Sequence, residues 1–279
     1  MRALNTQVIL VTGATDGLGR HVAQDLADQG ATVLLHGRNP DKGAATLRHI
    51  RQATGNDTLV YYNTDFASLD NVRHLAETIL AEHDRLDGLI NNAGLGARAP
   101  GALRQLSRDG YERRFAVNYL APFLLTHCLL PLLRRSAPAR IVHVASVGQQ
   151  PLDFDDVMLA EGYDDLRAYR QSKLAQIMFT FDQAEALVGS GVTVNALHPA
   201  TLMNTPMVGA ASGYFSGPMS TVEEGAEAVL YLATSPDLDG VTGQYFDGKR
   251  RARAHAQAYD AQARRRLRTL SEALTGLRA

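Results

Sequence analysis

The chain has 279 residues, of which 45% are hydrophobic and 20% are charged, and this is the composition of an ordinary soluble globular protein. Its formal net charge of −1 gives no overall reason to expect a nucleic-acid partner. The single cysteine, Cys128, excludes an intramolecular disulfide and suits a reducing compartment.

The N-terminal segment lacks the layout of a secretory signal. Residues 1–7 run directly into an apolar strand, without a basic start, an apolar run and a small-residue cleavage site. The uncharged stretch 115–133 is nearly long enough to cross a bilayer, but Asn118, Pro122 and Pro131 interrupt it. We therefore expect a buried helix there, no membrane span, and a cytoplasmic protein.

A glycine-rich turn follows the first predicted strand. Residues 8–11 form a continuous apolar run, typical of a strand buried on both faces of a parallel sheet, and a helical pattern then extends to Gly30. Glycines let the backbone approach a pyrophosphate, and the helix N-terminus presents free N–H groups. The spacing Gly-x-x-x-Gly-x-Gly therefore predicts dinucleotide binding. The predicted cofactor-binding residues of this turn are Thr12, Gly13, Thr15, Asp16, Gly17, Leu18 and Gly19.

The end of the second predicted strand, residues 32–36, indicates which dinucleotide is bound. In NAD sites an acidic side chain at this place accepts the ribose hydroxyls, but here Gly37 and Arg38 follow the strand. An arginine can pair with a 2′-phosphate, which a carboxylate would repel. We therefore favour NADP over NAD. The alternative is that Arg38 merely opens a solvated loop.

The third and fourth predicted strands, residues 59–62 and 86–90, each lead into a polar or small-residue segment. Asp65 and Phe66 follow the third strand, where Asp65 would meet the adenine ring or cap the next helix. Asn91-Asn92-Ala93-Gly94 follows the fourth strand and suits a tight loop that braces the glycine turn. Asn92, Ala93 and Gly94 are accordingly assigned to the cofactor site.

A long helix is predicted over residues 108–134, with Asn118 among apolar neighbours. The fifth strand, residues 141–145, ends at Ser146, on the edge where open α/β sheets bind ligands. The acidic connection 147–165 is interpreted as a solvated loop and not as a metal site. On the helix that follows, Tyr169 and Lys173 are four residues apart and share a face. An ammonium at that distance would lower the pKa of the phenol and make Tyr169 a general acid and base.

The last third of the chain completes the alternation of strands and helices. A sixth strand over 192–197 leads into His198, Pro199 and Ala200, and residues 200–220 are interpreted as a mobile lid over a substrate. A helix near 222–233 and a strand over 243–246 follow. The tail 249–279 contains nine basic residues against two acidic ones, with leucines at helical spacing. We expect it to be a helix docked on the body; binding to an anionic membrane or RNA is the alternative.

This regular alternation predicts an α/β protein with a single doubly wound parallel sheet of Rossmann type, helices on both faces, and one domain over residues 1–248. Over residues 7–248 the chain resembles the short-chain dehydrogenase/reductase family, in the Tyr-x-x-x-Lys branch that includes the retinol-dehydrogenase-like reductases. The motifs that carry the resemblance are the turn 12–19, the loop 91–94, Asn118, Ser146 and the segment 169–173. Two positions depart from the family: Ala145 stands where a second serine is frequent, and Ala200 where glycine is usual.

The resemblance implies a role for each matched residue. Ser146 would hydrogen-bond the substrate oxygen, and Tyr169 would donate a proton to it or accept one from it. Lys173 would lower the pKa of Tyr169 and hold the nicotinamide ribose, and Asn118 would position a water molecule that links Lys173 to solvent. Pro199 would line the nicotinamide side of the cofactor site.

We therefore expect an NADP-dependent oxidoreductase that interconverts a carbonyl and an alcohol on a small hydrophobic substrate. The alternative is a non-catalytic protein on the same fold that binds NADP(H) as a sensor or scaffold. The family commonly assembles through its two long helices, and the apolar stretch 115–133 allows a homodimer or homotetramer. No nucleic acid and no metal are expected.

Overall fold

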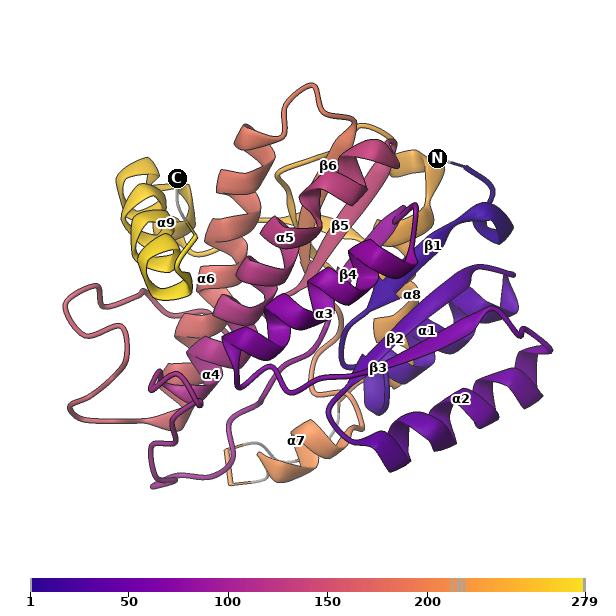
Figure 1. Cartoon of the computed structure of the whole chain (residues 1–279). Coiled ribbons are helices and arrows are strands. Elements are labelled where there is room, and N and C mark those ends of the chain that lie inside the picture. The colour runs from indigo at the N-terminus through magenta and orange to yellow at the C-terminus, as the bar shows by residue number, and fades with distance from the viewer. Residues whose placement is uncertain (1, 212, 215–216, 218, 278–279) are drawn as a thin grey trace.

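The computed structural model describes residues 2–211, 213–214, 217 and 219–277. Its centre is one eight-stranded sheet with the order β3-β2-β1-β4-β5-β6-β7-β8 (Figure 1). The strands are β1 (Val8–Val11), β2 (Thr32–Gly37), β3 (Leu59–Asn63), β4 (Gly88–Asn91), β5 (Ala139–Val144), β6 (Val192–His198), β7 (Tyr245–Asp247) and β8 (Arg250–Ala252). All pairs are parallel except β7 with β8, which form an antiparallel hairpin. The predicted fold class is confirmed, with this hairpin as the one antiparallel addition among the described residues.

Helices cover both faces of the sheet. One face carries α1 (Gly17–Asp28), α2 (Pro40–Thr54) and α8 (Val222–Thr234), and the other carries α3 (Leu69–Glu82), α5 (Ala121–Arg135) and α6 (Asp165–Ala186). Shorter elements are α4 (Arg113–Phe115), α7 (Pro206–Ala210), the 3-10 turns Leu4–Thr6, Pro236–Leu238 and Ala256–Tyr259, and a π-helical turn Ala116–Leu120. The strand order reverses beside β1, between β1 and β4, which is where open α/β sheets form ligand crevices.

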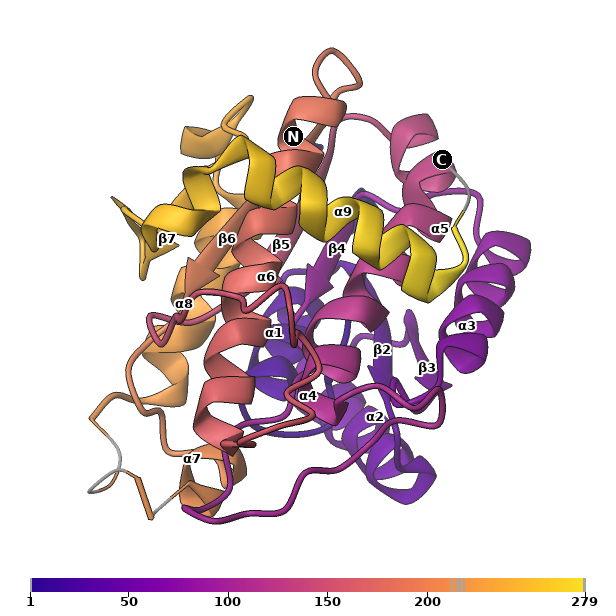
Figure 2. The same ribbon diagram turned by 90° about the vertical axis from the view of Figure 1, so that its left-hand side faces the viewer.

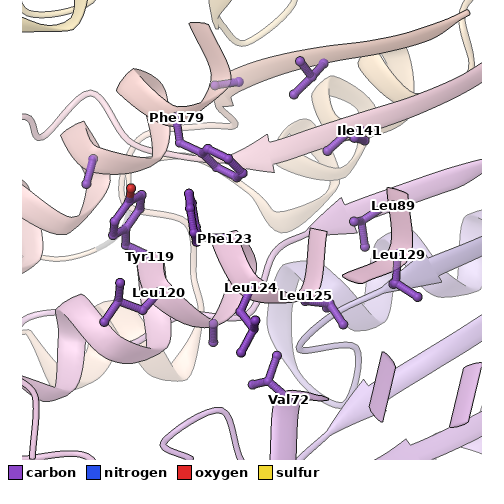
Figure 3. Close-up of a cluster of buried hydrophobic side chains, with 14 of the residues drawn as sticks. Val72, Leu89, Tyr119, Leu120, Phe123, Leu124, Leu125, Leu129, Ile141 and Phe179 are labelled. Carbon is purple, nitrogen blue, oxygen red and sulfur yellow. The ribbon is translucent and has the colours of Figure 1, made fainter. Parts of the chain in front are cut away.

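The core on the α5 and α6 face is built around aromatic rings (Figure 3). Phe123 of α5 and Phe179 of α6 lie with their ring centroids 5.0 Å apart, and Tyr119 packs edge-on against Phe179 at 6.3 Å. Leu124, Leu129 and other aliphatic side chains fill the space between α5 and the sheet. Each fully buried side chain of this size contributes about 1.5–3 kcal/mol to stability, so this layer holds α6 firmly against the sheet.

The helix predicted over 108–134 starts later than expected. Residues before Glu112 form an irregular segment in which Gly110 has φ 84° and Leu106 forms an antiparallel bridge with Glu112. The Glu112 carboxylate accepts the Phe115 N–H at 2.7 Å and so caps the helix start. The combined helix from Arg113 to Arg135 is long and apolar enough to cross a membrane, but 78% of its apolar window is buried inside the protein, as in the core helix of a soluble protein.

The tail forms a final helix, α9 (Ala261–Thr275), that lies across α5 and α6 (Figure 2). Leu267 is 1% exposed, and the Ser271 and Tyr119 hydroxyls form a fully buried hydrogen bond of 2.7 Å. Arg268 pairs with Asp182 at 3.1 Å, and two further arginines of α9 pair with Glu185 and Asp155. Three of the tail's basic residues are therefore paired with carboxylates of the protein itself.

Candidate active site

The glycine turn between β1 and α1 forms a tight cradle. Gly13 and Gly17 have φ of 67° and 46°, in the left-handed region that favours glycine. A Cβ added to Gly19 would lie 2.3 Å from the Gly13 carbonyl oxygen and 2.4 Å from Asn92 Nδ2. Asp16 caps α1 by accepting the Gly17 N–H at 2.9 Å. The cradle therefore exists only because these positions lack side chains.

The loop after β4 braces this cradle, as its sequence indicated. Asn92 Nδ2 donates to the Thr12 and Gly13 carbonyl oxygens at 2.9 and 3.2 Å. The Thr12 hydroxyl accepts the N–H groups of Asn92 and Ala93, both at 3.0 Å. The neighbouring Gly94 faces the second half of the site, because a Cβ there would lie 3.3 Å from Asn118 Oδ1 and 3.6 Å from Lys173 Nζ.

His36, at the end of β2, supports the cradle from below and was not singled out from the sequence. Its Nδ1 accepts the Gly13 N–H at 3.2 Å, so the neutral ring carries its proton on Nε2 and donates it to the Thr64 carbonyl at 3.0 Å. The ring stacks on Phe66 with centroids 4.0 Å apart. Burial lowers the pKa of His36 to about 4. The only signal in the sequence was a histidine near the end of a predicted strand, and the sequence alone does not distinguish such a histidine from an ordinary core residue.

This arrangement predicts a loss of stability in acid. Below its ordinary pKa of 6.5 the unfolded chain binds a proton on His36, and the folded chain does not until about pH 4. The free energy of unfolding should therefore fall between those values, by up to about 1.4 kcal/mol per pH unit for this one group. Urea titrations of wild type and His36→Gln from pH 7.5 to 4.5 measure it: the stability difference between them should change over this range. A constant difference would contradict the assignment, and the exposed His74→Gln is the matched control.

The predicted adenosine-phosphate end contains Arg38 and a second cation that the sequence analysis missed. Arg38 is exposed just after β2. Lys42 of α2 pairs with Asp16 of the glycine turn at 2.9 Å, and this hydrogen bond lowers the pKa of Asp16. Gly37 is closely packed, since a Cβ there would lie 2.6 Å from Thr15 Cγ2. The turn itself lacks a basic residue, but the fold brings one to it from α2.

Asp65 and Phe66 lie where β3 ends, although neither caps α3. Asp65 Oδ1 accepts the Ala67 N–H at 3.0 Å and shapes its own turn. Ser68 is the N-cap, so the alternative that Asp65 caps the next helix is wrong. Phe66 is 3% exposed, and its ring stacks on the ring of His36. Its ring therefore shapes the floor of this region from inside the core.

Tyr169 of α6 and Ser146 after β5 come together at the carboxyl edge of the sheet. Ser146 Oγ accepts the Gly148 N–H at 3.0 Å. A Cβ added to Gly148 would lie 3.4 Å from Ser146 Oγ and 3.8 Å from Tyr169 Cε1, so both side chains border the same small space. Behind them, Tyr245 of β7 donates to the Ser146 carbonyl at 3.1 Å, and Gln149 Nε2 donates to the same oxygen at 2.9 Å. Hydrogen bonds from two other positions thus fix the backbone of Ser146 at the carboxyl end of β5.

The predicted effect of Lys173 on Tyr169 is not what the structure shows. Burial raises the pKa of the Tyr169 phenol, and the hydrogen bond with Ser146 opposes that rise. Lys173 Nζ donates to the Val144 carbonyl at 2.8 Å and to Gln176 Oε1 at 3.0 Å, 5.9 Å from the centroid of the Tyr169 ring. Burial lowers the pKa of Lys173 itself to about 7. The predicted lowering is therefore wrong here, because burial disfavours the charged phenolate and is the largest cause of the shift of the Tyr169 pKa.

Asn118 is fully buried and joins this cluster through the π-helical turn. Its Oδ1 accepts the Leu95 N–H at 2.6 Å, and its Nδ2 donates to the Leu95 carbonyl at 3.0 Å and to Ser172 Oγ at 2.9 Å. Its amide thereby links the loop after β4 to α6, one residue from Lys173. A π-turn inside an α-helix is frequent at functional sites. The structure thus brings Asn118, Ser146, Tyr169 and Lys173 into one region.

The turn after β6 borders the same edge of the sheet. Pro199 is buried, and His198 Nε2 lies 3.1 Å from the Thr201 hydroxyl, so this histidine stabilises the turn. The predicted lid contains α7 and packs against residues 96–100, as shown by the close approach of Met207 to Gly96. Residues 212, 215–216 and 218 of the lid lie outside the described part of the chain. Within the described part, no group of three His, Cys, Asp or Glu side chains is placed to hold a metal.

A family model described as "short chain dehydrogenase" matches residues 7–213. The chain belongs to the short-chain dehydrogenase family. Retinol dehydrogenase 13 of Mus musculus is 38% identical over 97% of this chain and 84% of the relative. The predicted resemblance to the retinol-dehydrogenase-like members of the family is thereby confirmed.

Solved structures agree with this family membership. A short chain dehydrogenase from Escherichia coli CFT073, so described and crystallised with NADPH, is 31% identical and has a TM-score of 0.72 over 88% of this chain and 98% of the other. A 3-ketoacyl-(acyl-carrier-protein) reductase from Brucella melitensis, crystallised with NADH, has a TM-score of 0.70 over 88% and 97% at 24% identity, which supports the fold alone. This short-chain dehydrogenase is therefore an oxidoreductase by family.

Proposed function

We propose that this short-chain dehydrogenase is NADP-dependent and interconverts a carbonyl and an alcohol, with Tyr169 as proton donor and acceptor. The observation that carries the proposal is that the side chains of Ser146 and Tyr169 converge at Gly148, with the buried Lys173 ammonium 5.9 Å from the centroid of the Tyr169 ring. The test is consumption of NADPH by the purified protein in the presence of a panel of aldehydes and ketones.

The residues of the chain would fit a dinucleotide at this edge. The glycine cradle admits a pyrophosphate close to the backbone, and α1 directs the free N–H groups of its first turn toward it. The pyrophosphate would lie against the glycine turn, which consists of Thr12, Gly13, Thr15, Asp16, Gly17, Leu18 and Gly19. The 2′-phosphate would meet Arg38 and Lys42, and the adenine ring would lie near Asp65 and Phe66. The nicotinamide would be bordered by Asn92, Ala93, Gly94 and Pro199. A bound reduced nicotinamide supplies the hydride.

The protein side of the reaction follows from two donors that meet at one point. Negative charge develops on the substrate oxygen as its carbon is reduced, and the Ser146 and Tyr169 hydroxyls stabilise that charge where it forms. Because its pKa is raised, the Tyr169 phenol keeps its proton at neutral pH and is available as the acid. Lys173, with a pKa of about 7, exchanges protons readily, and Asn118 fixes the loop and helix around it.

The proposed preference for NADP over NAD rests on Arg38. Because Gly37 is closely packed, this preference has to be tested by a substitution at Arg38 and not at Gly37. An acidic replacement at Gly37 would collide with Thr15, so the informative change is Arg38→Ala alone. We expect the ratio of kcat/KM for NADPH over NADH to fall about 10- to 100-fold, because a charge-assisted hydrogen bond contributes about 1.5–3 kcal/mol. Arg48→Ala, an exposed arginine on α2, should leave the ratio unchanged. An unchanged ratio in Arg38→Ala would remove the basis for NADP.

The remaining assignments are part of the same proposal. The oxidoreductase domain extends over residues 1–248 and includes a substrate lid near 200–220, and the tail 249–279 is an extension packed on that domain. The protein is cytoplasmic, and its substrates are small molecules. Self-association is also proposed, but α9 covers the face of α5 and α6 that was expected to serve it. A homodimer or homotetramer would therefore have to use another surface.

A cofactor-binding sensor or scaffold is the second candidate. It would need the cradle, but it would not need hydroxyls of Ser146 and Tyr169 that converge beside Lys173. Tight NADPH binding without turnover on a broad carbonyl panel would favour this candidate over the oxidoreductase.

A further inference from the structure

A hollow of about 340 Å³ opens beside Ser146, on the side of β7 and β8. Its walls include Val147, Gln149, Tyr245, Asp247, Arg253 and His255. Tyr245 and Gln149 both donate to the Ser146 carbonyl, at 3.1 and 2.9 Å. The wall of the hollow is therefore joined to the backbone of Ser146 through the side chains of Tyr245 and Gln149, and Val147 continues it from Ser146 along the chain.

The hairpin that borders the hollow is rich in positive charge. Lys249 forms an ion pair with Glu227 at 2.8 Å. Arg250 lies directly opposite Asp247 in the antiparallel register, although the two side chains form no ion pair in the described part of the chain. Arg253 likewise forms no ion pair with a carboxylate among the described residues, although it lines the hollow. The guanidinium of Arg253 is thus available at the wall, on which Asp247 is the one carboxylate among the lining residues.

The surroundings of Arg253 orient it for recognition. Its guanidinium lies 5.7 Å from the centroid of the Tyr259 ring, a cation–π contact that restricts the side chain. His255, also in the wall, accepts the Gln257 N–H on Nδ1 at 3.2 Å, so its Nε2 carries the proton and is a donor. Val147, which is 57% exposed, Ala252 of β8 and Ala254 supply apolar surface to the same wall.

We infer that this hollow binds the end of the substrate remote from the reacting carbonyl, and that Arg253 pairs there with a carboxylate. The substrate class is an oxo acid whose carbonyl and carboxylate are separated by an aliphatic chain. A planar guanidinium binds a carboxylate through two parallel hydrogen bonds, which gives both affinity and orientation. The inference deepens the proposed carbonyl reduction and rests on it.

The experiment compares ω-oxo alkanoic acids of increasing chain length with their methyl esters, using NADPH and the full-length protein. At low ionic strength we expect one chain length at which the acid exceeds its ester in kcat/KM by about tenfold, mainly through KM. Added salt should reduce this advantage, because the pair is partly exposed. Arg253→Gln should abolish the advantage while turnover of the esters is retained, and Arg253→Lys should keep part of it.

Arg251→Gln is the matched control, since it removes the same charge two residues away, outside the wall of the hollow. Equal rates for acid and ester at every chain length, with esters turned over, would overturn the inference alone. An equal loss of preference in Arg251→Gln and Arg253→Gln would also overturn it, because the charge of the hairpin as a whole would then be responsible. If neither acid nor ester is reduced by wild type, the proposed function fails and this inference fails with it.

Discussion

Replacing Tyr169 with Phe should reduce kcat for carbonyl reduction by about 10²- to 10⁴-fold, the usual contribution of a positioned general acid. The substitution removes one oxygen and leaves the ring on α6, so the packing around Lys173 persists. NADPH binding, measured by fluorescence titration, should remain close to that of wild type. The proton donor and not the cofactor site is then what has been lost.

Tyr231→Phe is the matched control for this change, because Tyr231 belongs to α8 on the opposite face of the sheet. Its turnover should equal that of wild type. A Tyr169→Phe protein that keeps its full rate would refute the assigned proton transfer. The raised pKa of Tyr169 adds a second readout, since its proton should stay available for reduction through neutral pH.

Replacing Gly19 with Ala should weaken NADPH binding on the order of 100-fold. The new methyl group would lie 2.3 Å from the Gly13 carbonyl oxygen, so the backbone of the cradle has to move. Overpacking of this kind costs about 1–3 kcal/mol, and about 1.4 kcal/mol corresponds to each tenfold change in affinity. Equilibrium titration with NADPH measures the loss of affinity, and thermal unfolding without cofactor measures the loss of stability.

Gly209→Ala offers the comparison within the same chain. Gly209 lies on α7, and a Cβ there would meet no atom within 4 Å. This variant should bind NADPH and unfold as wild type does. If Gly19→Ala binds NADPH with wild-type affinity, the cradle is not where the pyrophosphate lies.

The motifs near the chemistry were predictable because each depends on a local physical requirement. The cradle needs glycines directly after a buried strand, and the spacing of Tyr169 and Lys173 places both on one helix face. The alternation of apolar strands with amphipathic helices was enough to predict the doubly wound sheet. In these places the sequence pattern and the tertiary structure impose the same constraint.

The features that were missed depend on contacts between distant segments. Lys42 reaches Asp16 from another helix, and Tyr245 reaches Ser146 across 99 residues of sequence. The sign of the pKa shift of Tyr169 depends on burial, which spacing alone does not reveal. The start of the helix at Arg113 was missed because it depends on a cap from Glu112 and on the left-handed conformation of Gly110, which the residues from Arg108 onward do not reveal.

The position of α9 ties the middle of the chain to a single peripheral helix. Ser271 and Leu267 of α9 complete a layer that includes Tyr119 and Phe179 from the middle of the sequence. If α9 detaches, apolar side chains of α5 and α6 lose their cover, so local unfolding of this one helix would expose the protein to proteases and chaperones.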